Sequence, residues 1–476
     1  MDAVETPETR GYARSADLVP DFVALLDAMM ILAAALIPFW MIVPYHQALL
    51  EPYLFCIGFV VLAAIVMLAE SGMYRLASIT QPVAKSDLII VSIISAFLFF
   101  LTIAFSLKVS ELYSRIWIYT FAGVAIFLTI VGRLAVREIL MQFEARRVVG
   151  RNIVVLGEGQ EAARFLRTVD QKVPALTDII GVFAARAPTE RTEIAGREVL
   201  GDCGDLIAFA RRHRVDAVVI TMPLSADGRV DALIAQLKEL PVHIYIASQL
   251  ADFELRFKPA LGFPDTLPLF EVVQRPISGW SALLKAVFDF IVASALIVLL
   301  APLLILVAIA IKIDSPGPVF FMQPRLGFNN RVFRIFKFRS MYHREVPERS
   351  VTQASKDDPR VTRVGRFIRR TSIDELPQLF NVLNGTMSLV GPRPHALSHN
   401  EDYGRRIRQY FTRHKVKPGI TGWAQVNNLR GETEVLSKME ARVEHDIFYA
   451  ENWSLLFDLR ILLMTVAVVF FQKTAY

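Results

Sequence analysis

The stretch IVASALIVLLAPLLILVAIAI occupies Ile291–Ile311 and holds no charged residue. It reaches the length of about 17–25 residues that a helix needs to cross the hydrocarbon core of a bilayer. Pro302 lies in its middle, where it removes a helical hydrogen bond and clashes with the preceding turn. A crossing here would place the rest of the chain on the opposite side of the membrane. The alternative is a re-entrant helix, expected over 284–313, that enters one leaflet, bends at Ala301 and Pro302, and returns.

The composition is that of a protein with a membrane part and soluble parts. The chain has 476 residues, of which 54% are hydrophobic and 21% are charged. It is too apolar for an ordinary soluble protein and too charged for a membrane bundle alone. The net charge of +6 suits anionic lipid or phosphate, and we expect no nucleic-acid partner. Cys56 and Cys203 predict neither a disulfide framework nor a thiolate metal site.

Four further apolar runs predict a bundle of transmembrane helices in a domain over 1–150. Arg10 and Arg14 precede the first run, the first loop contains neither Lys nor Arg, and a cluster of arginines follows the fourth run. By the positive-inside rule, the N-terminus and everything after Arg133 are expected to be cytoplasmic. The runs are Phe22–Val43, Pro52–Ala69, Leu88–Leu107 and Ile116–Gly132.

The segment over 151–265 alternates short apolar runs with helical patterns, which predicts a parallel sheet with helices. The turn GEGQEAA after the first strand gives Gly157-x-Gly159-x-x-Ala162, which is similar to a dinucleotide-binding fingerprint. The acidic residue that should follow the second strand is replaced by Ala184. We therefore predict a Rossmann-like cytoplasmic domain without a working nicotinamide site. Its expected strands are NIVVLG, IIGVFA, DAVVIT and VHIYIA.

The last part of the chain, 281–476, is expected to form a membrane-associated domain. Two apolar β-type runs flank the sequence GFNN, which predicts a β-hairpin. Near the C-terminus, Asp458 and Arg460 restrict the purely apolar run to Ile461–Phe471. That run is too short to span, so we expect an interfacial helix. The fold class is therefore a membrane protein, α plus α/β.

The sequence TSIDELPQLFNVLNG, from Thr371 to Gly385, has apolar residues at helical spacing and begins with Asp374 and Glu375. One explanation of the two carboxylates is a capping box from Ser372 to Glu375 at the start of an amphipathic helix. The other explanation is chemistry on a phosphate, in which one carboxylate is a nucleophile or a metal ligand. An acidic pair at a helix start is usually only a cap.

The surrounding residues favour phosphate chemistry. Arginines recur at every third position before the acidic pair, VGPRP holds Arg393 in a rigid turn, and KPGITGWAQVN is a glycine-rich loop with Thr421 and Gln425. Arginines and backbone amides bind diphosphates, and a helix N-terminus receives anions. Each feature alone can be explained without catalysis, for example by attraction of the arginines to anionic lipid. Their joint occurrence favours an enzyme that uses a phosphorylated lipid.

These blocks resemble those of a known family. FDFIVASALIVLLAPLLILVAIAIKIDSPGPVFFMQPRLG, FRIFKFRSM, TSIDELPQLFNVLNGTMSLVGPRP and KPGITGWAQVNNLRG are similar to successive motifs of the bacterial sugar transferases, the monotopic polyprenyl-phosphate hexose-1-phosphate transferases. The resemblance runs from Ser281 to the C-terminus. The four spans and the degenerate Rossmann-like domain resemble the long subclass, of the undecaprenyl-phosphate glucose or galactose phosphotransferase type, which initiates exopolysaccharide or O-antigen repeat units.

The resemblance implies a two-step reaction. Asp374 attacks the β-phosphate of a UDP-sugar, UMP leaves, and undecaprenyl phosphate then attacks the phosphosugar–aspartate intermediate. Glucose is the expected sugar and galactose the next choice. Mg²⁺ is the implied cofactor, with Asp374 and Glu375 as its ligands and catalytic residues. The implied substrate-binding residues are Arg325, Lys337, Arg339, Arg369, Arg393, Thr421 and Gln425. Small family members have Ser-Pro at the membrane bend, where this chain has Ala301-Pro302.

The resemblance also implies the bacterial inner membrane, with the catalytic domain on the cytoplasmic face, and leaves a homodimer open. Two other functions stay as alternatives. A membrane-anchored NAD-dependent nucleotide-sugar dehydratase or epimerase would use the Rossmann-like domain, and a non-enzymatic scaffold would only assist polysaccharide assembly. The missing acid after the second strand argues against the first, and UMP release would exclude the second.

Overall fold

The structure is a computed structural model. It describes residues 16–43, 46–171, 176–186, 193–222, 227–247, 269–342, 358–395, 397–407, 409–429 and 436–471. The chain forms two compact units. Unit 1 comprises Met1–Leu206, His213–Ala226 and Ile244–Val272, and unit 2 comprises Ile207–Arg212, Asp227–His243 and Val273–Tyr476.

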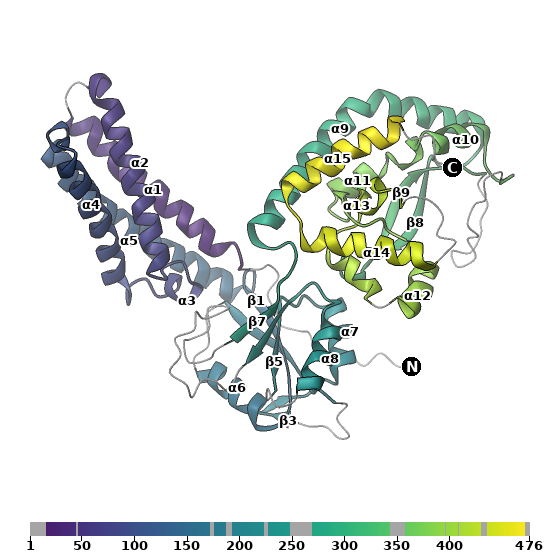
Figure 1. The fold of residues 1–476 in the computed structure, drawn as a ribbon, viewed down its shortest axis with the longest axis horizontal. Coiled ribbons are helices and arrows are strands. Elements are labelled where there is room, and N and C mark those ends of the chain that lie inside the picture. The colour runs from purple at the N-terminus through teal and green to yellow at the C-terminus, as the bar shows by residue number, and fades with distance from the viewer. Residues whose placement is uncertain are drawn as a thin grey trace. The chain divides into compact units, whose positions relative to one another are not determined.

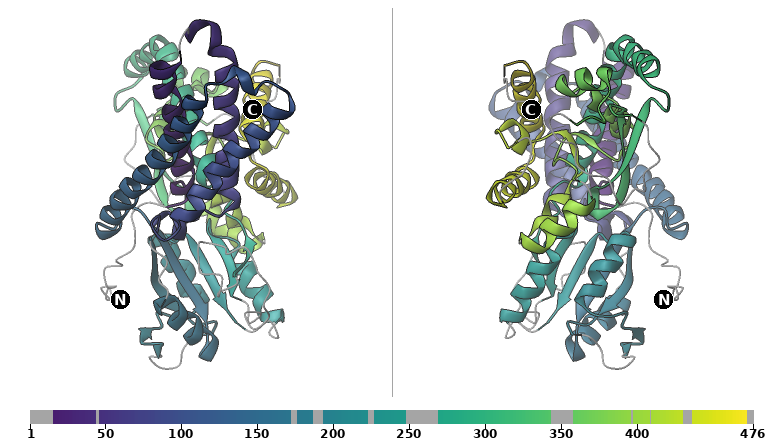
Figure 2. Two further views of the ribbon diagram at one scale, coloured as in Figure 1. Left: turned by 90° about the vertical axis from the view of Figure 1, so that its left-hand side faces the viewer. Right: turned by 90° about the vertical axis from the view of Figure 1, so that its right-hand side faces the viewer.

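The N-terminal half of unit 1 is built from four long helices. They are α1 (Val19–Ile42), α2 (His46–Glu70), α4 (Ser86–Ser106) and α5 (Arg115–Ala145), with the short α3 (Leu76–Ile79) and η1 (Ser110–Leu112) between them. α1 packs on α2 and α5, and α4 packs on α2 and α5, so that the four helices lie side by side (Figures 1 and 2). All four are long and apolar enough to cross a membrane, in agreement with the four predicted runs.

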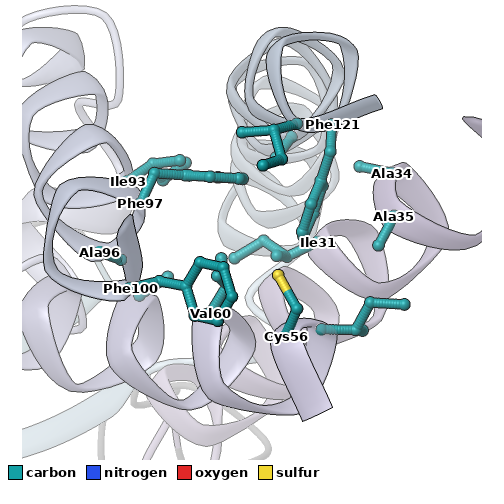
Figure 3. Packing of buried hydrophobic residues seen from close by; sticks show 14 of the residues in the cluster. Ile31, Ala34, Ala35, Cys56, Val60, Ile93, Ala96, Phe97, Phe100 and Phe121 are labelled. Carbon is teal, nitrogen blue, oxygen red and sulfur yellow. The ribbon is translucent and has the colours of Figure 1, made fainter. Parts of the chain in front are cut away.

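Aromatic and small aliphatic side chains fill the space between these helices (Figure 3). Phe97 of α4 meets Phe121 of α5 edge to face, with 4.7 Å between the ring centroids. Tyr53 of α2 lies 4.6 Å from Trp117 of α5. Cys56 is a buried free thiol in this core, and Cys203 is a second one elsewhere in unit 1.

A buried ion pair ties α1 to α5. Arg133 Nη2 lies 2.6 Å from Asp27 Oδ2, and both side chains are almost completely buried. Arg133 Nη1 also donates to the carbonyl oxygen of Met73, at 3.0 Å. The ring of Tyr74 lies against the guanidinium, 5.3 Å from centroid to Cζ. One charged group therefore joins two long helices and the turn after α2.

The rest of unit 1 contains a five-stranded sheet in the order β2-β1-β5-β6-β7. β1 runs parallel to both β2 and β5, which confirms the predicted parallel sheet. Along the chain the helices α6 (Gly159–Gln171), α7 (Cys203–Arg212) and α8 (Asp227–Leu237) alternate with the strands, although α8 and the end of α7 belong to unit 2. β3 (Glu193–Ile194) and β4 (Arg197–Glu198) form a small hairpin. The main strands are β1 (Arg151–Gly157), β2 (Thr177–Phe183), β5 (Ala217–Thr221), β6 (His243–Ala247) and β7 (Leu269–Val273).

Two glycines of the fingerprint-like turn have structural explanations. A Cβ on Gly157 would lie 1.8 Å from Oγ1 of Thr221, so the glycine allows β1 and β5 to approach each other. Gly159 has a φ of +64°, a conformation that L-residues with a side chain rarely adopt. Close strand packing and a positive φ therefore explain Gly157 and Gly159 without a bound dinucleotide.

The part of unit 2 that follows Val273 starts with α9 (Gly279–Asp314), one helix that contains Pro302 and is longer than the expected 284–313. Figure 1 shows that α9 changes direction along its length. It is the fifth helix that could span a membrane by length and composition. The predicted hairpin is confirmed, because β8 (Phe320–Leu326) and β9 (Val332–Phe338) pair antiparallel around η5 (Phe328–Asn330).

Short elements follow the hairpin, and their apolar side chains pack with α9. The core includes Ala293 of α9, Leu379 of α11 and Ile461 of α15. The elements are α10 (Arg363–Arg370), η7 (Ile373–Glu375), α11 (Gln378–Leu383), β10 (Ser388–Val390), α12 (Leu397–Arg406), η8 (Tyr410–Lys415), β11 (Gly419–Thr421), α13 (Trp423–Val426), α14 (Leu436–Glu451) and α15 (Leu455–Phe471).

Asp458 lies in the first turn of α15, where it is completely buried. It accepts hydrogen bonds from Lys285 Nζ of α9, at 2.6 Å, and from the Tyr449 hydroxyl, at 2.7 Å. The helix α15 therefore begins at Leu455, ahead of the purely apolar run Ile461–Phe471, and the charge of Asp458 within it is neutralised by Lys285.

We expect Asp27→Asn to destabilise unit 1, because it leaves the Arg133 guanidinium buried without its counter-ion. Removing one partner of a buried ion pair costs about 3–5 kcal/mol, whereas replacing both by apolar residues is often nearly neutral. The variant Asp27→Leu with Arg133→Met should therefore recover most of the lost stability. Thermal unfolding in detergent measures both. An unchanged melting temperature for Asp27→Asn would contradict the structural role of the pair.

Candidate active site

The acidic pair lies in a tight turn and not in the first turn of a long helix. α10 ends at Arg370, and Ser372 adopts a left-handed conformation with a φ of +57°. Asp374 and Glu375 then form the 3₁₀ turn η7, and α11 begins only at Gln378. Ser372 makes no side-chain capping hydrogen bond. The predicted amphipathic helix from Thr371 to Gly385 is therefore wrong in its first half, and the capping-box explanation of the two carboxylates is wrong with it.

Glu375 is held by two cations from different elements. Arg393 donates Nη2 to Oε1 at 2.6 Å and Nη1 to Oε2 at 3.1 Å, and Lys337 Nζ donates to Oε1 at 2.9 Å. Only 14% of the Glu375 side chain is exposed. Burial raises the pKa of this carboxyl, but Arg393 and Lys337 outweigh burial and hold the pKa well below its usual range. Glu375 is therefore ionised and fully engaged.

Asp374 is in the opposite situation, although it is the adjacent residue. Burial and, next, the negative charge of Glu375 raise the pKa of its carboxyl to about 6, because the cations Lys337, Arg369 and Arg393 offset only part of the two effects. Adjacent carboxyl groups whose environments separate their pKa values have different roles in many active sites. Asp374 is the more basic of the two and the better candidate for a nucleophile.

The fold brings four of the predicted basic residues around this turn. Lys337 lies on β9, Arg325 on the paired strand β8, Arg369 on α10 and Arg393 just after β10. Asn381 of α11, the helix after this turn, is bonded to β9 of the hairpin. Its side chain accepts from the backbone N–H of Phe336 at 2.8 Å and donates to the Arg334 carbonyl at 2.8 Å.

Arg325 contributes a buried positive charge to the same group. Its Nη2 donates to Gln323 Oε1 at 2.6 Å, and its buried Nε has no hydrogen-bond partner among the described residues. Burial and the charge of Arg393 lower the pKa of Arg325 to about 10, so the guanidinium is still charged at neutral pH. A buried donor near Glu375 and Arg393 is well placed for an anionic ligand.

Three predicted substrate-binding residues have other contacts. Arg339 is buried, and it donates to the carbonyl oxygens of Pro316 and Ser315, each at 2.7 Å, directly after the end of α9. Thr421 shares a hydrogen bond of 2.7 Å with the hydroxyl of Thr465 in α15. Gln425 donates to the Ile420 carbonyl at 3.4 Å, and its buried Oε1 has no partner in the described residues. None of these contacts joins them to Glu375.

Several buried polar residues close to Arg393 were not predicted from the sequence. Arg413 donates to the Arg393 carbonyl at 2.8 Å and forms an ion pair with Asp446 at 2.7 Å. His395 lies beside Arg413, with 2.7 Å between Nδ1 and Nη1. Arg413 sits in the basic run RHK, which looks like a solvated surface in the sequence, so no local signal indicated its burial.

The chemistry of the acidic pair is compatible with Mg²⁺. Mg²⁺ is usually bound by one or two protein carboxylates together with substrate phosphates. Among the described residues no group of three or more His, Cys, Asp or Glu side chains lies together, so a dedicated protein cage is absent from that part of the chain. Glu375 is already paired with two cations. Asp374 is therefore the residue that fits a metal best, with Glu375 in support.

The chain is similar to known proteins over almost its whole length. The family model for the bacterial sugar transferase domain matches residues 280–472, and one for a CoA-binding domain matches residues 69–248. The UDP-glucose:undecaprenyl-phosphate glucose-1-phosphate transferase of Xanthomonas campestris pv. campestris is 34% identical over 472 residues, covering 98% of this chain and 96% of the relative.

Two other relatives carry the same name. That of Escherichia coli (strain K12) is 42% identical over 302 residues, which cover 63% of each chain. That of Caulobacter vibrioides is 51% identical over 260 residues, which cover 55% of this chain and 88% of the relative. The chain belongs to the bacterial sugar transferase family and is a phosphoglycosyl transferase.

Proposed function

We propose that this enzyme transfers glucose 1-phosphate from UDP-glucose to undecaprenyl phosphate and releases UMP, at the start of exopolysaccharide or O-antigen repeat-unit synthesis. The names of the relatives support the two substrates. The single observation that carries the chemistry is the inequality of the two adjacent carboxyls, one with a raised pKa and the other neutralised by Lys337 and Arg393.

In the proposed first step a carboxylate oxygen of Asp374 attacks the β-phosphorus of UDP-glucose. The bond between this phosphorus and the bridging oxygen breaks, and the oxygen leaves with UMP. In the second step a phosphate oxygen of undecaprenyl phosphate attacks the same phosphorus, and the bond to Asp374 breaks. The carboxylate is regenerated, and undecaprenyl-diphospho-glucose is the product.

The basic residues around the turn have roles that follow from their placement. Lys337, Arg393, Arg325 and Arg369 stabilise the negative charge of the diphosphate, because they converge on the acidic pair from four elements. A bound Mg²⁺ would supply further charge neutralisation on the phosphates, with Asp374 and Glu375 as its protein ligands. Arg339 acts at a distance, by holding the end of α9. Thr421 and Gln425 stay predictions.

The membrane arrangement is part of the proposal. α1, α2, α4 and α5 would cross the bacterial inner membrane, and α9 would be re-entrant at Ala301 and Pro302. This topology keeps the catalytic part, 281–476, on the cytoplasmic face with UDP-glucose. The Rossmann-like domain, 151–265, would also be cytoplasmic, and its residues 248–265 lie outside the described residues. α15 would lie at the interface, and a homodimer stays open.

Asp374→Asn should abolish turnover while leaving the fold intact. Loss of a nucleophile costs about 10³-fold or more in rate. Because burial raises the pKa of Asp374, the fold disfavours its ionised form, so above pH 6 the variant should melt at the same temperature as wild type or higher. Without lipid acceptor, wild type should carry a hexose-phosphate adduct on the peptide with Asp374, seen by mass spectrometry.

The matched control is Asp402→Asn, since Asp402 is an exposed acid of the same unit, paired with Arg406 on α12. It should keep wild-type activity and form the adduct. If wild type releases UMP only when lipid acceptor is present, and no adduct can be trapped, direct transfer replaces the two-step mechanism.

The pH dependence of UMP release should follow the ionisation of Asp374. The nucleophile must be deprotonated, and its pKa is raised to about 6. Below that pH, kcat/KM should fall about tenfold per unit, since this parameter reports the free enzyme. Raising Mg²⁺ should move the acid limb to lower pH if Asp374 binds the ion, because a cation favours the carboxylate. A profile that is flat down to pH 4.5 would refute this role.

Both ends of α9 should be accessible from the cytoplasmic side. Trp280 and Ile313 are exposed near its two ends, so each can be replaced by cysteine in a chain without Cys56 and Cys203. In intact cells an impermeant maleimide should label neither until the inner membrane is opened. In a Pro302→Leu background, which favours a straight helix, Ile313→Cys should become accessible from outside. Labelling of Ile313→Cys in intact cells with Pro302 present would refute the re-entrant arrangement.

A further inference from the structure

The segment that carries Arg393 is held in place by its backbone. β10 pairs with β11, and beyond the strand the Gly391 N–H donates to the Thr421 carbonyl at 2.8 Å. On the next residue, the Pro392 carbonyl accepts from the Gly419 N–H at 3.0 Å. The sheet hydrogen bonds that the structure describes end there, one residue before Arg393. The position of the Arg393 side chain therefore depends on what binds the backbone of that residue.

Arg413 supplies that contact. It lies on η8, and its Nη2 donates to the Arg393 carbonyl at 2.8 Å. Its side chain is buried, with only 1% of the residue exposed. Nη1 donates to His395 Nδ1 at 2.7 Å. A guanidinium has only donors, so His395 must accept at Nδ1 and be neutral. Arg413 thus binds the chain at Arg393 and again two residues later.

The guanidinium is itself oriented by Asp446 of α14. Nη2 of Arg413 lies 2.7 Å from Asp446 Oδ2, and both side chains are almost fully buried. A buried ion pair is a weak source of stability, because desolvation of the two charges offsets their attraction. A pair of apolar residues would fill this space at less cost. The observed pair instead gives the Arg393 carbonyl a directional donor, which apolar residues could not provide.

We propose that Arg413, oriented by Asp446, is a positioning residue that sets the Arg393 guanidinium against Glu375. It touches neither the acidic pair nor, in this proposal, the substrate. It acts by fixing the Arg393 backbone, so that both Nη atoms reach the Glu375 carboxylate. The consequence is chemical: Glu375 stays neutralised by Arg393 and Lys337, and Asp374 keeps its place beside them.

The test is a double-mutant cycle on UMP release from UDP-glucose without lipid acceptor, with the full chain in detergent. The pair variant carries Arg413→Met together with Asp446→Leu, so that no buried charge of the pair is left alone. It should fold with a melting temperature near that of wild type and release UMP about 10²-fold more slowly, a loss typical of a misplacement of about 1 Å. In an Arg393→Met background the pair variant should cost less than about threefold, because residues that act through one another are not additive.

The control is the equally buried pair Asp27 and Arg133, whose partners all belong to unit 1. Asp27→Leu with Arg133→Met should change the rate by less than about twofold, which shows that loss of a buried pair is not enough by itself. Arg413→Lys is the second variant if the pair variant fails to fold. It keeps the charge but loses the fork of donors, and it should also slow release in the wild-type background and not in the Arg393→Met background.

The proposal rests on the proposed function, and the two fail differently. If wild type releases no UMP either with or without lipid acceptor, the proposed function is wrong and the positioning role falls with it. If wild type releases UMP only with the acceptor, the cycle is measured with the acceptor present. If wild type releases UMP and the costs of the Arg393 and Arg413 changes multiply in full, Arg413 does not act through Arg393. If the pair variant keeps wild-type turnover, the ion pair is only structural. Either of these last two results overturns the positioning role alone.

Discussion

The catalytic unit depends on the carboxylate of Glu375, which receives Arg393 from one side and Lys337 from the other. These three residues come from a short turn, a strand of the hairpin and the loop after β10. A buried carboxylate is stable only when its charge is compensated. The cations that neutralise Glu375 also set the two carboxyls apart. Asp374 feels the negative charge of Glu375, but it has no comparable ion pair in the described part of the chain. Two adjacent acids thereby become chemically different.

Buried ion pairs join long apolar helices at two places in the structure. Asp27 and Arg133 connect α1 with α5, and Lys285 and Asp458 connect α9 with α15. Apolar contacts between such helices are not directional, so they fix the distance between helices better than the rotation of one about its axis. A charged hydrogen bond adds direction. In unit 2, Tyr449 extends this connection, because its hydroxyl bonds to Asp458 or to the Val390 carbonyl of β10.

The sequence determined the elements that a local pattern can specify. Periodicity and turn residues correctly placed the four apolar runs, the first four strands of the sheet and the hairpin around GFNN. The strand β7 was not predicted, because Glu271 interrupts the apolar run LFEVV, although this strand is as long as β5 and β6. Residue types also indicated phosphate chemistry around Asp374, since arginines and paired carboxylates in ordered motifs have few other uses.

Only the tertiary structure decided what each residue of the candidate site does. Arg339 and Lys337 are two positions apart on one strand pattern, yet one holds the end of α9 and the other binds Glu375. The buried role of Arg413 is equally invisible in a basic run. The physical reason is that burial and charge compensation are set by side chains far away in the sequence. A pattern can show that a residue is an arginine at the right spacing, but only the packed structure shows which carboxylate or carbonyl it meets.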